Sequence, residues 1–409
     1  MIEPFIDEDK SLACVHCGLC LSACPTYLET GNENDSPRGR IYLMRAIQAG
    51  RLPVDDITVR HIDLCLGCRA CEPACPSGVE YGQLLEHTRD HIEKNYSRSV
   101  FQKILRRFAI EKIFPFPARL KLALLPARFI KALRLQWLLP KFARASLELV
   151  PDAAEAGRLP EVVSAKEARG SVGFIEGCVM QVMFAPTNLN SVRLLNDAGW
   201  DVHTPAGQGC CGALYAHSGQ LDLARECARH NIAVFEKLEL EAIIINAAGC
   251  GSTLKEYGAL LADDPDWAER GEAFSARVKD LTEWVEISRF AIRDSGLKVT
   301  YHDACHLAHP QGITAEPRAL VRAVVGDNFV ELPEAEICCG SAGSYNLTEP
   351  EMAARLQRRK IDNILSTGAE VVVTSNPGCQ LQIQAGLKKA GSKMRVMHIA
   401  DFLATSRVE

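Results

Sequence analysis

The sequence predicts a mixed fold, α+β overall, with a helical N-terminal domain, a basic helical linker and a duplicated α/β region that contains parallel sheets. Three patterns support this prediction. Cysteine runs near the N-terminus alternate with amphipathic helical stretches, a basic segment follows them, and short β-branched runs then alternate with helical stretches. We expect four parts, at residues 1–96, 97–170, 171–296 and 297–409.

Two runs of cysteines near the N-terminus share the pattern C-x-x-C-x-x-C-x-x-x-C-P. In bacterial ferredoxins, the first three cysteines of such a run bind one [4Fe–4S] cluster and the fourth binds the other cluster. The sequence therefore predicts two [4Fe–4S] clusters. The predicted ligands are Cys14, Cys17, Cys20 and Cys75 for the first cluster, and Cys65, Cys68, Cys71 and Cys24 for the second.

Zinc and disulfide bonds are the alternatives for these cysteines. Structural zinc usually takes four ligands in two separated pairs, and the repeated x-x spacing leaves one cysteine too many in each run. Disulfides require an oxidising compartment, and the acidic start of the chain lacks the basic and then apolar order of an export signal. We therefore expect a cytoplasmic protein whose thiolates bind iron.

Length and composition are those of an ordinary globular protein. The chain has 409 residues, of which 47% are hydrophobic and 24% charged, and its formal net charge of −5 gives no indication of nucleic-acid binding. No run approaches the roughly 18 apolar residues of a membrane-spanning helix, so we expect none.

The stretch between the cysteine runs predicts a helix. Ser36 can cap it, Pro37 suits its first position, and Gly50 suits its end. A helix inserted here favours the helical type of two-cluster ferredoxin domain, which a second amphipathic helix closes near residue 96. Arg38 and Arg40 are expected beside a cluster, where they tune its potential, contact a partner, or simply form a basic surface.

A basic segment at residues 103–144 contains eleven Lys or Arg and a single acid, Glu111. Prolines at positions 115, 117, 126 and 140 are expected to cut it into short helices. Basic amphipathic helices bind the headgroup region of anionic membranes, and the same composition suits packing on the protein itself or on another subunit. Residues 151–170 are expected to form a linker.

The C-terminal half contains an internal duplication. Four cysteines of one copy recur in the other with offsets of 127 to 129 residues, and each copy predicts buried strands that end in a cysteine. The matched cysteines are Cys178, Cys210, Cys211 and Cys250 in the first copy, and Cys305, Cys338, Cys339 and Cys379 in the second. Cys227 lies outside this scheme, opposite Arg355, and is expected to be a structural thiol.

Ligand sites of open α/β sheets lie beyond the carboxyl ends of the strands, where several of these cysteines are expected. The eight matched cysteines are therefore candidates for a further iron–sulfur centre, for a vicinal redox thiol pair, or for the lining of a quinone or partner site. His302 and His306 are further candidates, as ligands or proton carriers, and the alternative for both is a structural role at a strand end.

The chain contains, in order, the stretches CVHCGLCLSACPTYL, SPRGRIYL, CLGCRACEPACPSGV, QGCCGALYAHSGQ, YHDACHLAHPQG and ICCGSAGSYNL. These stretches resemble the iron–sulfur subunit of bacterial glycolate oxidase (glycolate dehydrogenase). The C-terminal half is similar to the cysteine-rich CCG domain found in heterodisulfide reductase, in anaerobic glycerol-3-phosphate dehydrogenase and in lactate-utilisation iron–sulfur proteins. In that family each copy ends in C-x-x-C, whereas the ends around Cys250 and Cys379 carry one cysteine each, which weighs against noncubane clusters.

The resemblance implies a complex in which FAD-bearing partner subunits oxidise glycolate, and often D-lactate, to the 2-oxo acid. This chain would hold no catalytic residue and would relay electrons toward a membrane quinone, as a peripheral protein on the cytoplasmic face of the inner membrane. We find no G-x-G-x-x-G fingerprint after a strand, which agrees with FAD on a partner. The alternatives are the corresponding subunit of a glycerol-3-phosphate or lactate dehydrogenase, a CCG-domain disulfide or quinone reductase, and an iron–sulfur scaffold or sensor.

Overall fold

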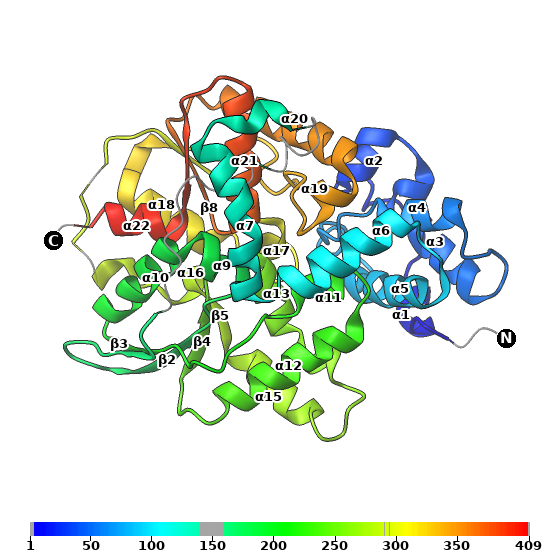
Figure 1. Ribbon diagram of the computed structural model, residues 1–409, viewed down its shortest axis with the longest axis horizontal. Helices are drawn as coiled ribbons and strands as arrows, with labels where there is room; N and C mark the ends of the chain where they lie inside the picture. The colour runs from blue at the N-terminus through cyan, green and yellow to red at the C-terminus, as the bar shows by residue number, and fades with distance from the viewer. Residues whose placement is uncertain are drawn as a thin grey trace.

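The computed structural model describes residues 4–139, 147, 150, 159–289, 291–293 and 295–407. Helices of the N-terminal part form one end of the molecule, and two β-sheets with their flanking helices form the other (Figure 1). The predicted fold class is confirmed, because helices and strands are mixed and both C-terminal sheets contain parallel strands. The expected division at residues 96, 170 and 296 stays a prediction.

Short helices and two cysteine loops build the N-terminal part. Its helices are α1 (Glu8–Leu12), α2 (Pro25–Thr30), the 3-10 helix η1 (Glu33–Asp35), α3 (Pro37–Gln48), α4 (Asp56–Asp63) and α5 (Tyr81–Asn95). Helix α3 is the one predicted between the cysteine runs, because the Gly39 N–H donates to the Ser36 cap over 3.0 Å and Pro37 occupies the first turn. Met44 and Ile62 pack in the apolar core between α3, α4 and α5.

The basic segment is helical along most of its described length. It contains α6 (Val100–Leu105), the π-helix η2 (Arg106–Ile113), α7 (Pro117–Ala132) and the 3-10 helix η3 (Leu135–Leu138). Pro126 lies inside α7, so the break expected there is wrong. The carbonyl group that loses its donor at this proline belongs to Leu122, which is 67% exposed, so water can replace the missing N–H. The break expected at Pro140 lies outside the described residues.

The first sheet has the strand order β1-β3-β2-β4-β5, and all neighbouring strands are parallel except β1 and β3. Its strands are β1 (Val162–Val163), β2 (Gly170–Phe174), β3 (Trp200–His203), β4 (Ala242–Ile245) and β5 (Val278–Asp280). Strand β1 falls in the expected linker, where two β-branched valines pair with the edge of β3. The helices are α9 (Cys178–Met183), α10 (Ala185–Asp197), α11 (Ala213–His217), α12 (Leu221–Phe235), α13 (Ala248–Lys255), α14 (Tyr257–Leu260), α15 (Ala268–Arg277) and α16 (Leu281–Trp284).

The second sheet is entirely parallel, with the order β7-β6-β8-β9. Its strands are β6 (Val299–His302), β7 (Phe329–Val330), β8 (Val371–Thr374) and β9 (Arg395–His398). The helices are α17 (Cys305–Ala308), α18 (Ala315–Val325), α19 (Tyr345–Thr348), α20 (Pro350–Ser366), α21 (Pro377–Lys389) and α22 (Ile399–Thr405), with the 3-10 turns η4 (Ile287–Arg289) and η5 (Gly326–Asn328).

Both sheets contribute to one apolar core. Helix α10 of the first half packs on α22 of the second, and Val172 of β2 belongs to the same buried cluster as Val299 of β6. His398 Nε2 closes this junction, 2.8 Å from the carbonyl oxygen of Asn246. The halves are therefore fixed relative to each other, and the segments that follow β2, β4, β6 and β8 face one shared space.

The close packing of η1 on α3 generates a stability prediction. A Cβ atom added at Gly39 would overlap the carbonyl oxygen of Glu33, a rigid backbone group. We expect Gly39→Ala to lower the free energy of unfolding by about 1–3 kcal/mol, the usual cost of overpacking, in a denaturant titration. Gly207→Ala is the control, because its Cβ would make an ordinary 3.4 Å contact with Val234. Equal stabilities of the two variants would contradict the packing described here.

Candidate metal centres

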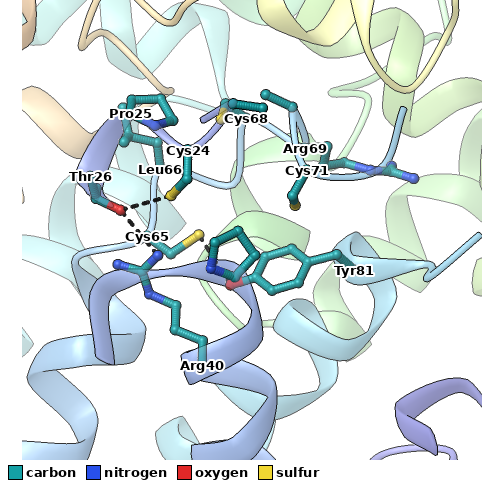
Figure 2. Close-up of a pocket in the computed structure, with 13 residues that line it drawn as sticks. Cys24, Pro25, Thr26, Arg40, Cys65, Leu66, Cys68, Arg69, Cys71 and Tyr81 are labelled. Carbon is teal, nitrogen blue, oxygen red and sulfur yellow. Dashed lines mark hydrogen bonds between the residues drawn. The ribbon is translucent and has the colours of Figure 1, made fainter. Parts of the chain in front are cut away.

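Four buried cysteines from both runs converge on one pocket of the N-terminal part, and they are Cys24, Cys65, Cys68 and Cys71. Cys24 is the N-cap of α2, and the other three lie in the loop between α4 and α5. Figure 2 shows the sulfur atoms of Cys24, Cys65 and Cys71 pointing toward the same space. The first run thus supplies one sulfur and the second run three, which is the grouping that the ferredoxin pattern predicts.

Arg40 lies beside this pocket and is completely buried. Its Nε donates to the His61 carbonyl over 2.7 Å and its Nη1 to Thr26 over 3.1 Å, whereas Nη2 makes no hydrogen bond within the described residues. A buried donor left over beside four sulfurs fits the sulfide atoms of an iron–sulfur cluster. Burial alone would raise the pKa of Cys65, but the positive charges of Arg40 and Arg89 hold that pKa below its usual value.

The remaining N-terminal cysteines line a second pocket, and they are Cys14, Cys17, Cys20 and Cys75. Cys17 is exposed, so this pocket lies nearer the protein surface than the first one. Arg38 lies at its side, where Nη1 donates to the His16 carbonyl over 3.0 Å and Nε to the Glu33 carboxylate over 2.7 Å. The structure therefore places one of the two candidate arginines beside each cysteine set.

The two cysteine loops have the same backbone shape. His16 and Gly18 in the first run have φ values of 55° and 86°, and the equivalent Gly67 and Arg69 in the second run have values of 67° and 61°. Such left-handed residues turn the chain tightly and can aim backbone N–H groups inward. The Gly67 N–H, for example, lies 3.4 Å from the sulfur of Cys65.

A cavity of about 480 Å³ lies where the two C-terminal halves meet the N-terminal part. Leu66 lines both this cavity and the pocket of Cys65, so the two spaces adjoin. Every matched cysteine of the duplication except Cys339 contributes to the cavity wall. Most of the other lining residues are apolar, and several come from η2 and α7 or the turn between them, namely Ile113, Phe114, Leu120, Ala123 and Leu124.

The cysteines of the first half form a connected group of thiols. The sulfurs of Cys178 and Cys210 lie 3.7 Å apart, and thiol hydrogen bonds from Cys178, Cys211 and Cys227 lower the pKa of Cys210 well below its usual value. The sequence predicts a structural role for Cys227, but α12 places it against this group. Its spacing from the CCG motif has no counterpart in the second half, and for that reason the repeat does not reveal it.

The cysteines of the second half lie next to the buried N-terminal set. Cys305 and Cys338 share an apolar cluster with Cys68, so thiols from distant parts of the sequence are neighbours. Within the half, Cys305 interacts with Cys338 and Cys339 with Cys379. The Asn376 amide lies 3.5 Å from the Cys379 sulfur.

Two histidines meet at the cavity, only one of which is a candidate from sequence. The ring of His306 lies edge-on to that of His217, with centroids 4.9 Å apart, and both line the cavity. His306 Nε2 also lies 2.9 Å from the Gly67 carbonyl, and burial lowers its pKa to about 3, so it is neutral at physiological pH. His217 Nδ1 pairs with Glu86 over 3.0 Å. The other candidate, His302, is not among the residues that line the cavity and lies beside Cys339 and Cys379.

Two protein-family descriptions match this chain. A 4Fe-4S dicluster domain matches residues 10–79, and a Cysteine-rich domain matches residues 172–255 and 299–384. The matched segments contain both N-terminal cysteine sets and the duplicated cysteines of the cavity. The fold and these sites define an iron–sulfur protein of an oxidoreductase complex.

Relatives along nearly the whole length narrow this class. The chain is 41% identical to the probable glycolate oxidase iron–sulfur subunit of Bacillus subtilis strain 168, over 97% of this chain and 94% of the relative. It is 36% identical to the glycolate oxidase iron–sulfur subunit of Escherichia coli K12, over 92% and 91%. It is 27% identical to one subunit of the CoM/CoB fumarate reductase of Methanothermobacter marburgensis, over 98% and 73%. The chain belongs to the family of glycolate oxidase iron–sulfur subunits.

The separate placement of the two arginines predicts separate effects on two redox centres. Removing the buried charge in Arg40→Gln should lower the midpoint potential of only the centre held beside Cys65, because a nearby cation favours the reduced, more negative state. Arg38→Gln should lower the potential of only the other centre. An anaerobic redox titration followed by EPR measures both, with Arg40→Lys as the charge-preserving control. Identical titrations of wild type and both Gln variants would contradict this placement.

Proposed function

We propose that this chain relays electrons from an FAD-containing partner, which oxidises glycolate or D-lactate to the 2-oxo acid, toward a membrane quinone. The continuity of the sulfur sites carries the proposal. The exposed set around Cys17 leads to the buried set around Cys68, whose neighbours are Cys305 and Cys338 at the large cavity. Single electrons need only centres that lie close together, so this order provides a path from the surface to the cavity.

The proposed relay uses two [4Fe–4S] clusters in the N-terminal part. The set of Cys14, Cys17, Cys20 and Cys75 would hold the first, and the set of Cys65, Cys68, Cys71 and Cys24 the second. When bound, the clusters supply one-electron chemistry, while the protein supplies thiolate ligands and the Arg38 and Arg40 charges. No residue of this chain is proposed to act on the hydroxy acid, which would react at the flavin of the partner.

The cavity suits an apolar acceptor such as a quinone. Its wall is largely apolar, and the imidazoles of His217 and His306 supply polar groups where the cavity meets the N-terminal part. Ligand sites of this kind combine an apolar lining with a few placed polar groups. Quinone reduction takes up protons, and His217, paired with the Glu86 carboxylate, can deliver a proton at the cavity wall.

Helix α7 supports a proposed location at the cytoplasmic face of the inner membrane. Its inner side lines the cavity at Leu120 and Leu124, and its outer side exposes large apolar residues that include Leu122, Leu125 and Phe129. Lysines and arginines accompany these residues, as in helices that lie on anionic membranes. Figure 1 shows α7 crossing the front of the molecule close to α9, on which it packs. None of the described helices is long and apolar enough to span a bilayer.

The relay predicts dependence on the flavoprotein. The purified chain should contain iron that dithionite reduces, and it should not reduce a dye with glycolate until the flavoprotein is added. In the complex, Cys17→Ser and Cys68→Ser should abolish electron transfer to quinone and leave the flavin reducible by substrate, because each change removes a proposed cluster ligand. Glycolate-dependent dye reduction by this chain alone, or normal throughput in either variant, would overturn the proposal.

The quinone site predicts a selective loss on filling the cavity. Leu124→Trp should slow quinone reduction by the complex about tenfold or more, equivalent to ~1.4 kcal/mol, because the indole occupies the acceptor's space. Reduction of a water-soluble dye should remain. Leu122→Trp, on the exposed side of the same helix, is the matched control. Quinone kinetics that are equal in both variants would exclude this cavity as the acceptor site.

A further inference from the structure

His302 occupies an unusual place at the carboxyl end of β6, the strand between β7 and β8. Its side chain is fully buried, and neither ring nitrogen makes a hydrogen bond within the described part of the chain. Side chains alternate along the strand, so His302 and Thr300 point to the opposite face from Val299 and Tyr301, which belong to the core shared by both sheets. A buried imidazole without a partner is costly in an apolar interior and calls for a ligand role.

Two sulfurs lie within reach of this imidazole. A ring nitrogen of His302 and the Sγ atoms of Cys339 and Cys379 all lie within 4.8 Å of one another. Metal–nitrogen bonds of about 2.0 Å and metal–sulfur bonds of about 2.3 Å separate two ligands of one metal by roughly 3.5–4 Å, so a small movement brings all three to one ion. Cys338, next to Cys339 in the chain, and Cys305 supply further sulfurs at the same end of the sheet.

The groups around the three side chains are those of an orienting outer shell. The Ala335 backbone faces the His302 ring, and the Asn376 amide lies 3.5 Å from the Cys379 sulfur. Histidines that bind metals commonly present their second nitrogen to a backbone carbonyl, and sulfur ligands commonly accept hydrogen bonds. The contacts of Ala335 and Asn376 therefore fit a metal centre at this position.

A buried cation adjoins the same sulfurs. Lys360 of α20 is 2% exposed, and its ammonium donates to the carbonyls of Glu334 and Ala335. The thiols of Cys338 and Cys339 are close enough to interact with its charge. Buried charges are rare unless a charge of opposite sign compensates them, and cysteines that bind a metal as thiolates would provide it.

The first half lacks both of these groups. At the offset that relates Cys178 to Cys305, the counterpart of His302 is Ile175. Gly212 packs on Ala224 and Gly340 on Ala353, and this offset of 129 residues places Asn231 opposite Lys360. The first half instead has Cys227 as an additional sulfur. The duplicated halves therefore share four cysteines each but differ in the fifth potential ligand.

We propose that the second half holds an iron–sulfur centre with mixed cysteine and histidine ligation, in which His302 supplies a nitrogen ligand beside Cys339 and Cys379. The choice of iron rests on the proposed relay and on the neighbouring Cys68, whereas the ligand role of His302 rests on geometry alone. A neutral imidazole leaves a centre less negative than a thiolate does, and histidine ligation raises the potential of such centres. The centre would therefore favour electrons beside the cavity.

The test uses the anaerobically purified full chain, dithionite-reduced and examined by pulsed EPR. Wild type should contain more than the about eight irons of two cubanes and should show the hyperfine coupling of a coordinated nitrogen, which changes to that of ¹⁵N after labelling with ¹⁵N-histidine. His302→Gln should lose this coupling and part of the iron. His302→Cys should keep the iron, lose the coupling and lower the midpoint potential. His398→Gln is the matched control, because both nitrogens of that buried histidine have protein partners.

Three results would overturn the inference. They are a nitrogen coupling that survives in His302→Gln, a wild-type content of about eight irons per chain, and zinc instead of iron as the additional metal. Failure of the relay is a separate result, since that test measures coupled glycolate oxidation while this one measures metal content and hyperfine coupling. The signals of the N-terminal clusters serve as the internal reference for correct folding in each variant.

Discussion

The convergence of sulfur atoms from two distant cysteine runs is the constraint on which the structure depends. Each N-terminal pocket takes three sulfurs from one run and the fourth from the other, so α2 and α3 must return the chain to the same place. Buried contacts hold this arrangement, including the bonds of Arg40 to His61 and Thr26. The small core of Met44, Ile62 and their neighbours therefore serves mainly to fix the positions of sulfur atoms.

The same constraint extends to the junction with the C-terminal halves. Arg89 donates to the carbonyls of Cys65 and His217, and the Tyr345 hydroxyl donates to the Leu64 carbonyl over 2.8 Å. His306 contacts the Gly67 carbonyl at the same junction. These bonds join the backbone of the second cysteine loop to residues of the cavity wall and its surroundings, so the loop and the cavity are held together as one rigid unit.

Duplication explains the architecture of the C-terminal region but not its chemistry. Both halves direct the ends of their central strands to one cavity, since parallel sheets place these ends along a common edge. The halves then differ, with Cys227 added in the first and His302 with Lys360 in the second. Two similar folds packed through α10 and α22 thereby present two different ligand environments to the same space.

The sequence by itself determined the cysteine sets, the cap of α3 and the buried strands β2, β4, β6 and β8, because local spacing and hydrophobic pattern encode these features. Short or partly buried strands such as β3 and β9 carry too weak a pattern, and Pro126 does not end its helix because exposure of Leu122 lets α7 continue. Only the tertiary structure decided which side chains from distant segments meet. The contacts of His217 with His306, Cys227 with Cys210 and His302 with two sulfurs depend on packing between elements, which no local pattern encodes.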